Sequence, residues 1–246
     1  MSKLLIETNN QVQLLTLNRP ETKNAFDSEL WTLLGDALNN ANANPTISSV
    51  IITGSDNTFS SGVDLSSMVG EGGAEYEKPF ETCVDALMNF TKPLIGAVNG
   101  IAIGGGATIL LHFDAVFISA KAKLKYPFSE LGLAPEVGSS FLLFQSLGYQ
   151  KAAQLLFESN WISGTEYFNL GLAKYVGDDF FEKAFSYAFT LKDQSLSSIV
   201  ETKAILKTFL IQDINKAREL ENLAMKRLFG SADNLKAIEN FFSKKK

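Results

Sequence analysis

The chain has 246 residues, 46% of them hydrophobic and 20% charged, with a net charge of −5. This composition is that of an ordinary globular protein, and the length allows one large domain or a domain with an appendage. The acidic balance disfavours a general binder of nucleic acid or of anionic membranes. A single cysteine, Cys83, excludes an internal disulfide, and a single histidine, His112, excludes a multi-histidine metal centre.

The ends of the chain carry no recognisable targeting pattern. The N-terminal segment MSKLLIETNNQ turns polar after three apolar residues, which is too short for the apolar stretch of a signal peptide. No stretch approaches the roughly 20 apolar residues that span a bilayer. The final KKK is not a peroxisomal tripeptide of the Ser-Lys-Leu type. We therefore expect a cytoplasmic protein with neither a membrane nor a nucleic-acid partner.

The first half of the chain alternates strand and helix patterns. Leu4–Thr8 and Val12–Leu17 predict a hairpin around an Asn9–Asn10 turn, and Asp27 is placed to cap a helix through Ala41. The next predicted elements are the strand Ser49–Thr53 ending at Gly54, the helix Glu75–Asn89, the strand Leu94–Val98, the helix Gly104–Phe113 and the strand Ala115–Ser119. Such alternation with few hairpins predicts a largely parallel α/β core.

After about residue 140 the pattern is mostly helical. The predicted helices are Phe141–Leu147, Gln150–Phe157, Gly164–Leu170, Phe180–Leu191, Ser195–Leu210, Ile214–Phe229 and a last helix from Ser231 or Asp233 to Phe242. These late helices carry many apolar residues. They therefore pack on a core of their own or on another subunit.

The peptide FSSGVDL (Phe59–Leu65) follows a predicted strand and consists mainly of small residues. Ser60, Ser61 and Gly62 leave the backbone uncovered, and Gly62 can adopt a positive φ, so a ligand can approach the main chain closely. A plain loop with a helix cap at Asp64 explains the same residues. The motif alone leaves both interpretations open.

The peptide NGIAIGGGATIL (Asn99–Leu110) places three glycines at the start of a predicted helix. Gly104, Gly105 and Gly106 each cost roughly 1 kcal/mol relative to alanine within a helix, so some other interaction must offset them. Close helix packing is one explanation. The other is an exposed helix N-terminus whose free N–H groups stabilise an oxyanion. No Gly-Lys-Ser/Thr follows, so the motif is not a phosphate loop.

The peptide LGLAPEVGSS (Leu131–Ser140) carries one carboxylate, Glu136, among apolar and small residues. Its nearest preceding cation in the sequence is Lys125. A carboxylate in apolar surroundings has a raised pKa, which suits a general base. The alternative is a glutamate in the first turn of a helix 137–147, where it favours the helix dipole.

His112 and Cys83 are predicted to be structural. His112 lies between Leu111 and Phe113, without a catalytic partner nearby in the sequence, which indicates a core or interface histidine. Cys83 falls within a helical pattern and is predicted to be a small core residue.

Taken in order, these motifs resemble the crotonase (enoyl-CoA hydratase/isomerase) superfamily, closest to Δ3,Δ2-enoyl-CoA isomerases of the peroxisomal type. The resemblance covers nearly the whole chain and is carried by LNRPETKNAFD (Leu17–Asp27), FSSGVDL, NGIAIGGG, Asp114 and PFSELGLAPE (Pro127–Glu136). It implies an α/β fold with a crotonase-like ββα spiral core over residues 1–190. A C-terminal helical oligomerisation region over 191–246, forming a homotrimer or a dimer of trimers, is implied as well.

The resemblance also implies the site residues. The backbone N–H groups of Val63 and Gly105 would form an oxyanion hole for the thioester oxygen of an acyl-CoA. The two walls of the CoA groove would be Lys23, Asn24 and Ala25 on one side and Ser61, Gly62, Val63, Asp64 and Leu65 on the other. A C-terminal lysine, Lys245, would approach the CoA phosphates.

Departures from the family pattern indicate the subgroup. The two glutamates of family hydratases are replaced by Thr108 and Phe128, whereas Glu136 matches the single glutamate of the isomerases. Phe128 would then belong to an apolar wall that excludes water. A glycine is usual where Val137 stands, which leaves the backbone shape beside Glu136 open.

The reaction expected from these residues is the transfer of a double bond from C3 to C2 of an acyl-CoA, with Glu136 as base and no cofactor, since CoA is part of the substrate. One alternative is an enoyl-CoA hydratase or another crotonase-type enzyme acting on acyl-CoA. Another alternative, from a different class, is a non-catalytic module that binds acyl-CoA.

Overall fold

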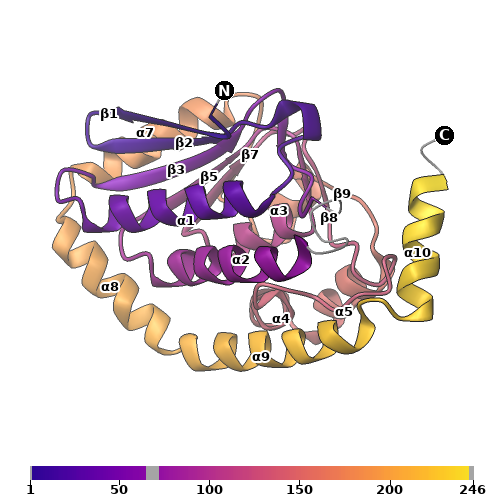
Figure 1. Ribbon diagram of the computed structural model, residues 1–246. Helices are drawn as coiled ribbons and strands as arrows, with labels where there is room; N and C mark the ends of the chain where they lie inside the picture. Colours follow the sequence, from indigo (N-terminus) through magenta and orange to yellow (C-terminus); the bar gives the residue numbers. More distant parts are fainter. Residues whose placement is uncertain (1, 65–71, 244–246) are drawn as a thin grey trace.

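A computed structural model describes residues 2–64 and 72–243 of the chain (Figure 1). Its centre is a six-stranded sheet with the strand order β1-β2-β3-β5-β7-β10. The strands are β1 (Leu4–Asn9), β2 (Val12–Leu17), β3 (Ser49–Gly54), β5 (Leu94–Val98), β7 (Ala115–Ile118) and β10 (Tyr175–Val176). The hairpin β1–β2 is antiparallel and the four remaining pairs of this sheet are parallel, as the sequence predicts.

A second sheet of short strands has the order β4-β6-β8-β9. Its strands are β4 (Thr58–Ser60), β6 (Ile101–Ile103), β8 (Lys123–Lys125) and β9 (Ile162–Ser163). Each of β4, β6 and β8 comes directly after a strand of the first sheet and is followed by a helix. This repeated ββα unit turns the chain back to the same side of the sheet, so the segments after β4, after β6 and after β8 gather at one edge.

Helices cover both faces of the large sheet. The helices α1 (Ser28–Ala43) and α2 (Gly72–Asn89) lie on one face, and α7 (Phe180–Lys192) lies on the other (Figure 1). Asp27 caps α1 as predicted, since its side chain accepts a hydrogen bond from the Leu30 amide. Buried aliphatic and aromatic side chains of α1, α2 and the strands between them form the main core.

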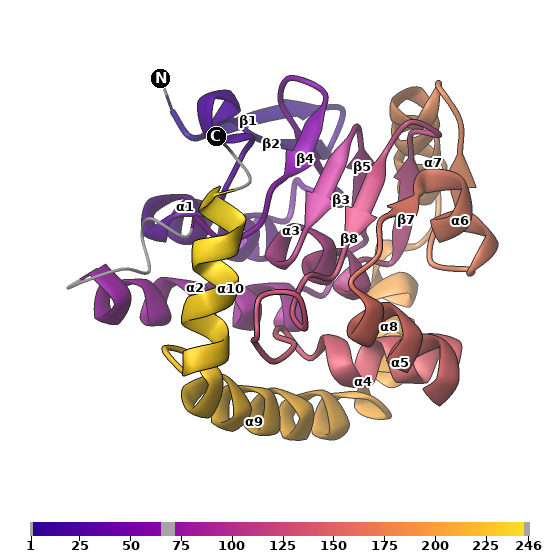
Figure 2. The same cartoon turned by 90° about the vertical axis from the view of Figure 1, so that its right-hand side faces the viewer.

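The C-terminal part is helical, as predicted. Its helices are α4 (Ser139–Leu147), α5 (Tyr149–Glu158), α6 (Gly164–Asn169), α8 (Leu196–Thr208), α9 (Ile211–Leu228) and α10 (Ala232–Ser243). In Figure 1, α8 and α9 run along the lower side of the molecule, and Figure 2 shows α10 rising from the end of α9. None of the described helices is both long and apolar enough to cross a membrane.

Two predicted details are wrong, and one feature of the fold was missed. The hairpin turn lies one position later, because Asn10 and Gln11 adopt positive φ and Asn9 still pairs in β1. The helix predicted from Gly104 is an α-helix only over α3 (Gly105–Thr108) and continues as a 3₁₀-helix, η3 (Ile109–His112). The short strands of the second sheet carry too few residues for a periodic pattern and were not predicted.

Candidate active site

The two segments predicted to line the CoA groove lie side by side. A 3₁₀-helix, η1 (Pro20–Thr22), ends in Lys23 and Asn24, both with positive φ. The Ser61 amide donates to the Lys23 carbonyl (2.9 Å), and the Ser60 hydroxyl donates to the Asn24 carbonyl (2.8 Å). Segments 23–25 and 60–62, far apart in the sequence, therefore form one continuous surface of backbone.

Buried polar contacts of Arg19 stabilise the packing of these two segments. Its guanidinium donates to the Ala25 carbonyl (2.6 Å) and lies 3.2 Å from carboxylate oxygens of both Asp64 and Asp27. Arg19 and both carboxylates are largely buried, so charge-assisted hydrogen bonds stabilise the turn rather than a solvated ion pair. Asp64, predicted in the groove wall, thus anchors the loop to which Val63 belongs.

The glycines of the two motifs meet at close range. A Cβ atom added at Gly62, which has a φ of +86°, would stand 2.4 Å from the Ile103 carbonyl oxygen and 3.4 Å from the Gly105 nitrogen. Only glycine fits here, both because of the left-handed conformation and because of the approaching backbone. The resulting contact brings the chain after β4 against the start of α3.

The amides of Val63 and Gly105 are the two predicted oxyanion donors. Their neighbours are engaged: the Gly62 amide donates to the Ser60 hydroxyl (3.1 Å), and the Gly104 amide donates to the Lys125 carbonyl (3.0 Å). Over residues 2–64 and 72–243, by contrast, the amides of Val63 and Gly105 have no hydrogen-bond acceptor. Two unsatisfied N–H groups, one on the loop after β4 and one at the start of α3, are suited to binding an oxyanion.

Glu136 lies beside these donors. A Cβ atom added at Gly105 would stand 3.4 Å from Glu136 Oε1 and 3.7 Å from Val63 Cγ2. The three residues predicted to carry the chemistry lie on the loop after β4, at the start of α3 and before α4, and they therefore surround one point. Glu136 precedes the α4 N-cap, Gly138, and the first turn of α4 contains no acidic residue, so the helix-dipole alternative is excluded.

The surroundings of Glu136 raise its pKa. Burial has the largest effect, and the negative charges of Glu221 and Glu81 add to it, so the pKa rises from 4.5 to about 7. No ion pair of Glu136 with a lysine or arginine occurs within the described part of the chain. A carboxyl group of this kind accepts and returns a proton near neutral pH.

The backbone after Glu136 is unusual. Val137 has a φ of +64° and is followed by Gly138 with a φ of +72°. Val137 therefore holds, with a β-branched side chain, the left-handed conformation that a glycine adopts more easily. His112 Nε2 lies 2.8 Å from the Val137 carbonyl oxygen and donates to it. Because burial lowers the pKa of His112 to about 4, its imidazole is neutral near pH 7, and it acts as a structural histidine, as predicted.

An aromatic cluster beside the site was missed in the sequence. Trp31 stacks on Phe26, meets Phe80 edge to face, and donates its indole N–H to the Tyr76 hydroxyl. Trp31 Cζ2 would stand 3.6 Å from a Cβ atom at Gly105. The signal available in the sequence is the i, i+4 spacing of Tyr76 and Phe80 on α2, which places both rings on one face. This cluster supplies an apolar boundary to the site.

Other predicted site residues lie deeper or outside the described residues. Asn24 is fully buried, and its amide bonds to Ser55 and Thr58, so its side chain supports the turn. Phe128 is 4% exposed and belongs to the main core. Leu65 and Lys245 fall outside the residues that the structure describes.

A cavity of about 440 Å³ lies elsewhere, between α8, α9 and the core, and none of the predicted site residues lines it. Its two lysines already bond to the protein. Lys203 Nζ donates to Asp114 (2.6 Å) and to the Lys92 carbonyl, while Lys207 Nζ donates to backbone carbonyls of α2 and the following loop. Within the described residues, no group of three or more His, Cys, Asp or Glu side chains could hold a metal ion.

Over the described residues, two backbone amides without an acceptor lie close to a single carboxylate of raised pKa, an arrangement suited to stabilising an enolate and moving its proton. The family model described as "Enoyl-CoA hydratase/isomerase" matches residues 7–246, and the chain belongs to this family. The fold is accordingly that of the crotonase superfamily, an α/β fold with C-terminal helices.

Some relatives of this chain are named as hydratases and others as isomerases. A probable enoyl-CoA hydratase of Rhizobium meliloti is 29% identical over 99% of this chain and 96% of its own length. The peroxisomal enoyl-CoA delta isomerase 3 of Mus musculus is 33% identical over 69% of this chain and 55% of its own length. The crystal structure of an enoyl-CoA hydratase/isomerase from Pseudoalteromonas atlantica, 30% identical, superposes with a TM-score of 0.93 over 99% of this chain and 98% of that one.

Proposed function

We propose that the protein is a Δ3,Δ2-enoyl-CoA isomerase. The observation that carries the proposal is the single raised-pKa carboxylate, Glu136, next to Gly105 and Val63. In the proposed mechanism the amides of Val63 and Gly105 bind the thioester oxygen of a 3-enoyl-CoA, and Glu136 removes a proton from C2. The negative charge passes to the thioester oxygen, and the same carboxyl group returns the proton at C4, which gives the trans-2-enoyl-CoA.

The oxyanion donors, the single base and the groove walls each have a separate role in the proposed mechanism. A preorganised backbone donor is typically worth about 3–4 kcal/mol to the transition state. One base is sufficient because C2 and C4 are close to each other. The groove walls formed by residues 23–25 and 61–64 would hold the CoA moiety, which enters as part of the substrate.

The positions of the missing hydratase glutamates favour isomerisation over hydration. Thr108 is fully buried, and its hydroxyl donates to the Gly105 carbonyl (3.3 Å), so it offers no second carboxylate. Phe128 is a buried aromatic residue. Hydration needs a group that positions and activates water, and neither residue supplies one. Enoyl-CoA hydration is nevertheless the second candidate, because the relative from Rhizobium meliloti is named as a probable hydratase.

The direct experiment is the variant Glu136→Gln assayed with 3-hexenoyl-CoA. Isomerisation should be abolished while acyl-CoA binding persists. The exposed Glu130, in the same peptide, gives the matched control Glu130→Gln, which should keep full activity. Full isomerase activity in Glu136→Gln would refute the proposal.

Two further assays separate the alternatives. Rapid loss of the conjugated thioester absorbance after crotonyl-CoA is added would identify a hydratase instead. Exchange of deuterium into C2 of a bound acyl-CoA separates an enzyme from a module that only binds, since a binder moves no proton.

The proposed assembly is a homotrimer or a dimer of trimers. Large apolar side chains are exposed on the C-terminal helices and their connections: Ile205, Leu206, Phe209, Leu220, Leu223, Leu228, Phe229 and Leu235. An apolar surface of this kind is typical of an interface between subunits. Light scattering after size-exclusion chromatography should give three or six times the chain mass. The boundary near residue 190 and the cytoplasmic location remain predictions.

A further inference from the structure

A buried carboxylate of α9 reaches the loop that follows Glu136. Glu221 is 5% exposed, and its Oε2 accepts the Gly138 amide at 2.7 Å. Its Oε1 accepts the Ser140 amide at 2.9 Å and also the Ser140 hydroxyl. In the described part of the chain, Glu221 forms no ion pair, so these hydrogen bonds from the loop are its observed partners.

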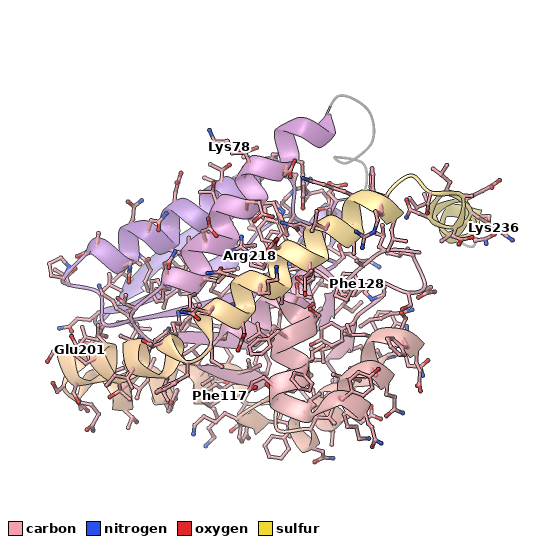
Figure 3. All side chains as sticks on the ribbon, turned by 90° about the horizontal axis from the view of Figure 1, so that it is seen from below. Lys78, Phe117, Phe128, Glu201, Arg218 and Lys236 are labelled. Carbon is pink, nitrogen blue, oxygen red and sulfur yellow. The ribbon has the colours of Figure 1, made fainter. Side chains whose placement is uncertain are left out.

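The helix that carries Glu221 is held firmly against the site. A Cβ atom added at Gly138 would stand 2.9 Å from Ile214 Cγ2, so α9 and the loop pack without space between them. One turn before Glu221, Arg218 bonds to Asp85 (2.7 Å) and to Glu81 on α2. Figure 3 shows Arg218 near the middle of α9, where this helix runs beside α2. Glu221 is therefore a fixed acceptor rather than a mobile side chain.

The loop needs such an anchor. Val137 and Gly138 both have positive φ, and the left-handed conformation of Val137 costs on the order of 1–2 kcal/mol. Strained backbone persists only when its surroundings hold it in place. His112 bonds to the Val137 carbonyl on one side, and Glu221 accepts the amides of Gly138 and Ser140 on the other. Glu136 lies directly before this doubly held segment.

We propose that Glu221 is a positioning residue for the base: by binding the amides of Gly138 and Ser140 it fixes the direction of the Glu136 side chain toward Gly105. This inference rests on the proposed function, since Glu136 is the base in that proposal. In this proposal Glu221 acts through the loop and does not itself contact the substrate.

The same carboxylate acts on Glu136 through its charge. Other charged and titratable groups surround the site: Glu81, Asp85 and Tyr76 on α2, Arg218 on α9, His112 on η3 and Asp64 on the loop after β4. Arg218 is engaged by two carboxylates and His112 is neutral near pH 7. Glu221, together with Glu81, therefore leaves a negative potential at Glu136, which keeps its proton bound to a higher pH.

The experiment compares Glu221→Gln with the matched control Glu219→Gln, which removes an exposed carboxylate from the same helix. In Glu221→Gln, an amide N–H₂ replaces one acceptor oxygen, so one loop amide loses its partner. We expect kcat for 3-hexenoyl-CoA to fall roughly 10- to 100-fold, with KM little changed, because the base is misdirected. The acid limb of the pH profile should move to lower pH. Glu219→Gln should keep the wild-type kcat and the wild-type acid limb.

Two measurements without turnover accompany the kinetics. Amide exchange of the peptide containing Gly138 and Ser140 should be faster in Glu221→Gln than in Glu219→Gln. The carboxyl ¹³C resonance of Glu136, assigned by its disappearance in Glu136→Gln, should titrate at lower pH. Faster amide exchange with an unchanged kcat and an unchanged acid limb would show that Glu221 has a purely structural role, and would overturn the proposal. The proposal would also be overturned if Glu221→Gln and Glu219→Gln gave the same results in all of these measurements.

The results distinguish a failure of the proposed isomerase function from a failure of the role proposed for Glu221. An active Glu136→Gln variant overturns the isomerase mechanism, whereas an inactive Glu136→Gln together with a fully active Glu221→Gln overturns only the role of Glu221. If Glu221→Gln does not fold, Glu221→Asp keeps the charge but shortens the reach. It should then lower kcat while the acid limb stays at the wild-type position, and wild-type kcat in this variant would count against the proposal.

Discussion

Gly105 and Glu136 are 31 positions apart in the sequence, yet a Cβ atom added at Gly105 would stand only 3.4 Å from Glu136 Oε1. The next glycine differs. A Cβ atom at Gly106 would stand 2.6 Å from the Ser60 carbonyl oxygen, a backbone atom that cannot move aside. Two adjacent glycines thus have separate reasons to be glycine: Gly105 lies beside the proposed catalytic carboxylate, and Gly106 packs against the Ser60 backbone.

The pair of variants Gly105→Ala and Gly106→Ala tests this difference. Gly105→Ala should change the free energy of unfolding by less than about 1 kcal/mol but lower kcat/KM by roughly 10- to 100-fold, because the methyl group enters the reacting space. Gly106→Ala should lose about 1–3 kcal/mol of stability through overpacking. Chemical denaturation and the isomerase assay check both values. A Gly105→Ala enzyme with normal activity would show that this space is not used.

Glu136 should link activity and stability to pH in opposite ways. As the proposed base it must be ionised, so the rate should rise with pH through about 7. Its folded-state pKa is raised from 4.5, so its favourable contribution to stability is fully present below pH 4.5 and is lost as the pH rises through about 7. The loss is on the order of 3 kcal/mol.

Denaturant unfolding of wild type and Glu136→Gln over this pH range measures the effect. The variant should lack the decline and be the more stable protein above pH 7. Parallel stability curves for the two proteins would contradict a raised pKa at this residue.

His112 should give the opposite dependence. Burial lowers its pKa from 6.5 to about 4, so its contribution to stability is present above pH 6.5 and is lost as the pH falls through about 4. His112→Gln can still donate an N–H to the Val137 carbonyl but does not titrate. The free energy of unfolding of this variant should therefore fall less steeply with acid than that of wild type, which urea titrations at several pH values would reveal.

The cost of replacing Val137 by glycine can be compared with that of the same change at Val116 on β7, because both residues are 3% exposed. Replacement by glycine removes about 2–3 kcal/mol of buried apolar contact at either site. At Val137 alone, where φ is +64°, glycine also relieves about 1–2 kcal/mol of left-handed strain. Val137→Gly should therefore be about 1–2 kcal/mol less destabilising than Val116→Gly. Equal losses in thermal or chemical unfolding would indicate that the strain at Val137 is negligible.

The sequence by itself determined the long elements and the chemical candidates. The period of apolar residues in α1 and the β-branched run of β3 are local patterns, and burial of one face is enough to select helix or strand for them. Glu136 and the glycine run were recognisable for a similar reason. A lone carboxylate among apolar residues and three adjacent glycines are costly unless something offsets them, which marks them as unusual in any fold.

Only the tertiary structure decided how these residues meet. The contact of Gly62 with Gly105 depends on short strands whose pairing is set by the longer strands beside them, and no local pattern encodes it. The aromatic boundary around Trp31 and the hold of Glu221 on Gly138 join segments up to 83 residues apart. Such contacts arise from packing whole helices against a sheet, so they exist only once the chain has folded.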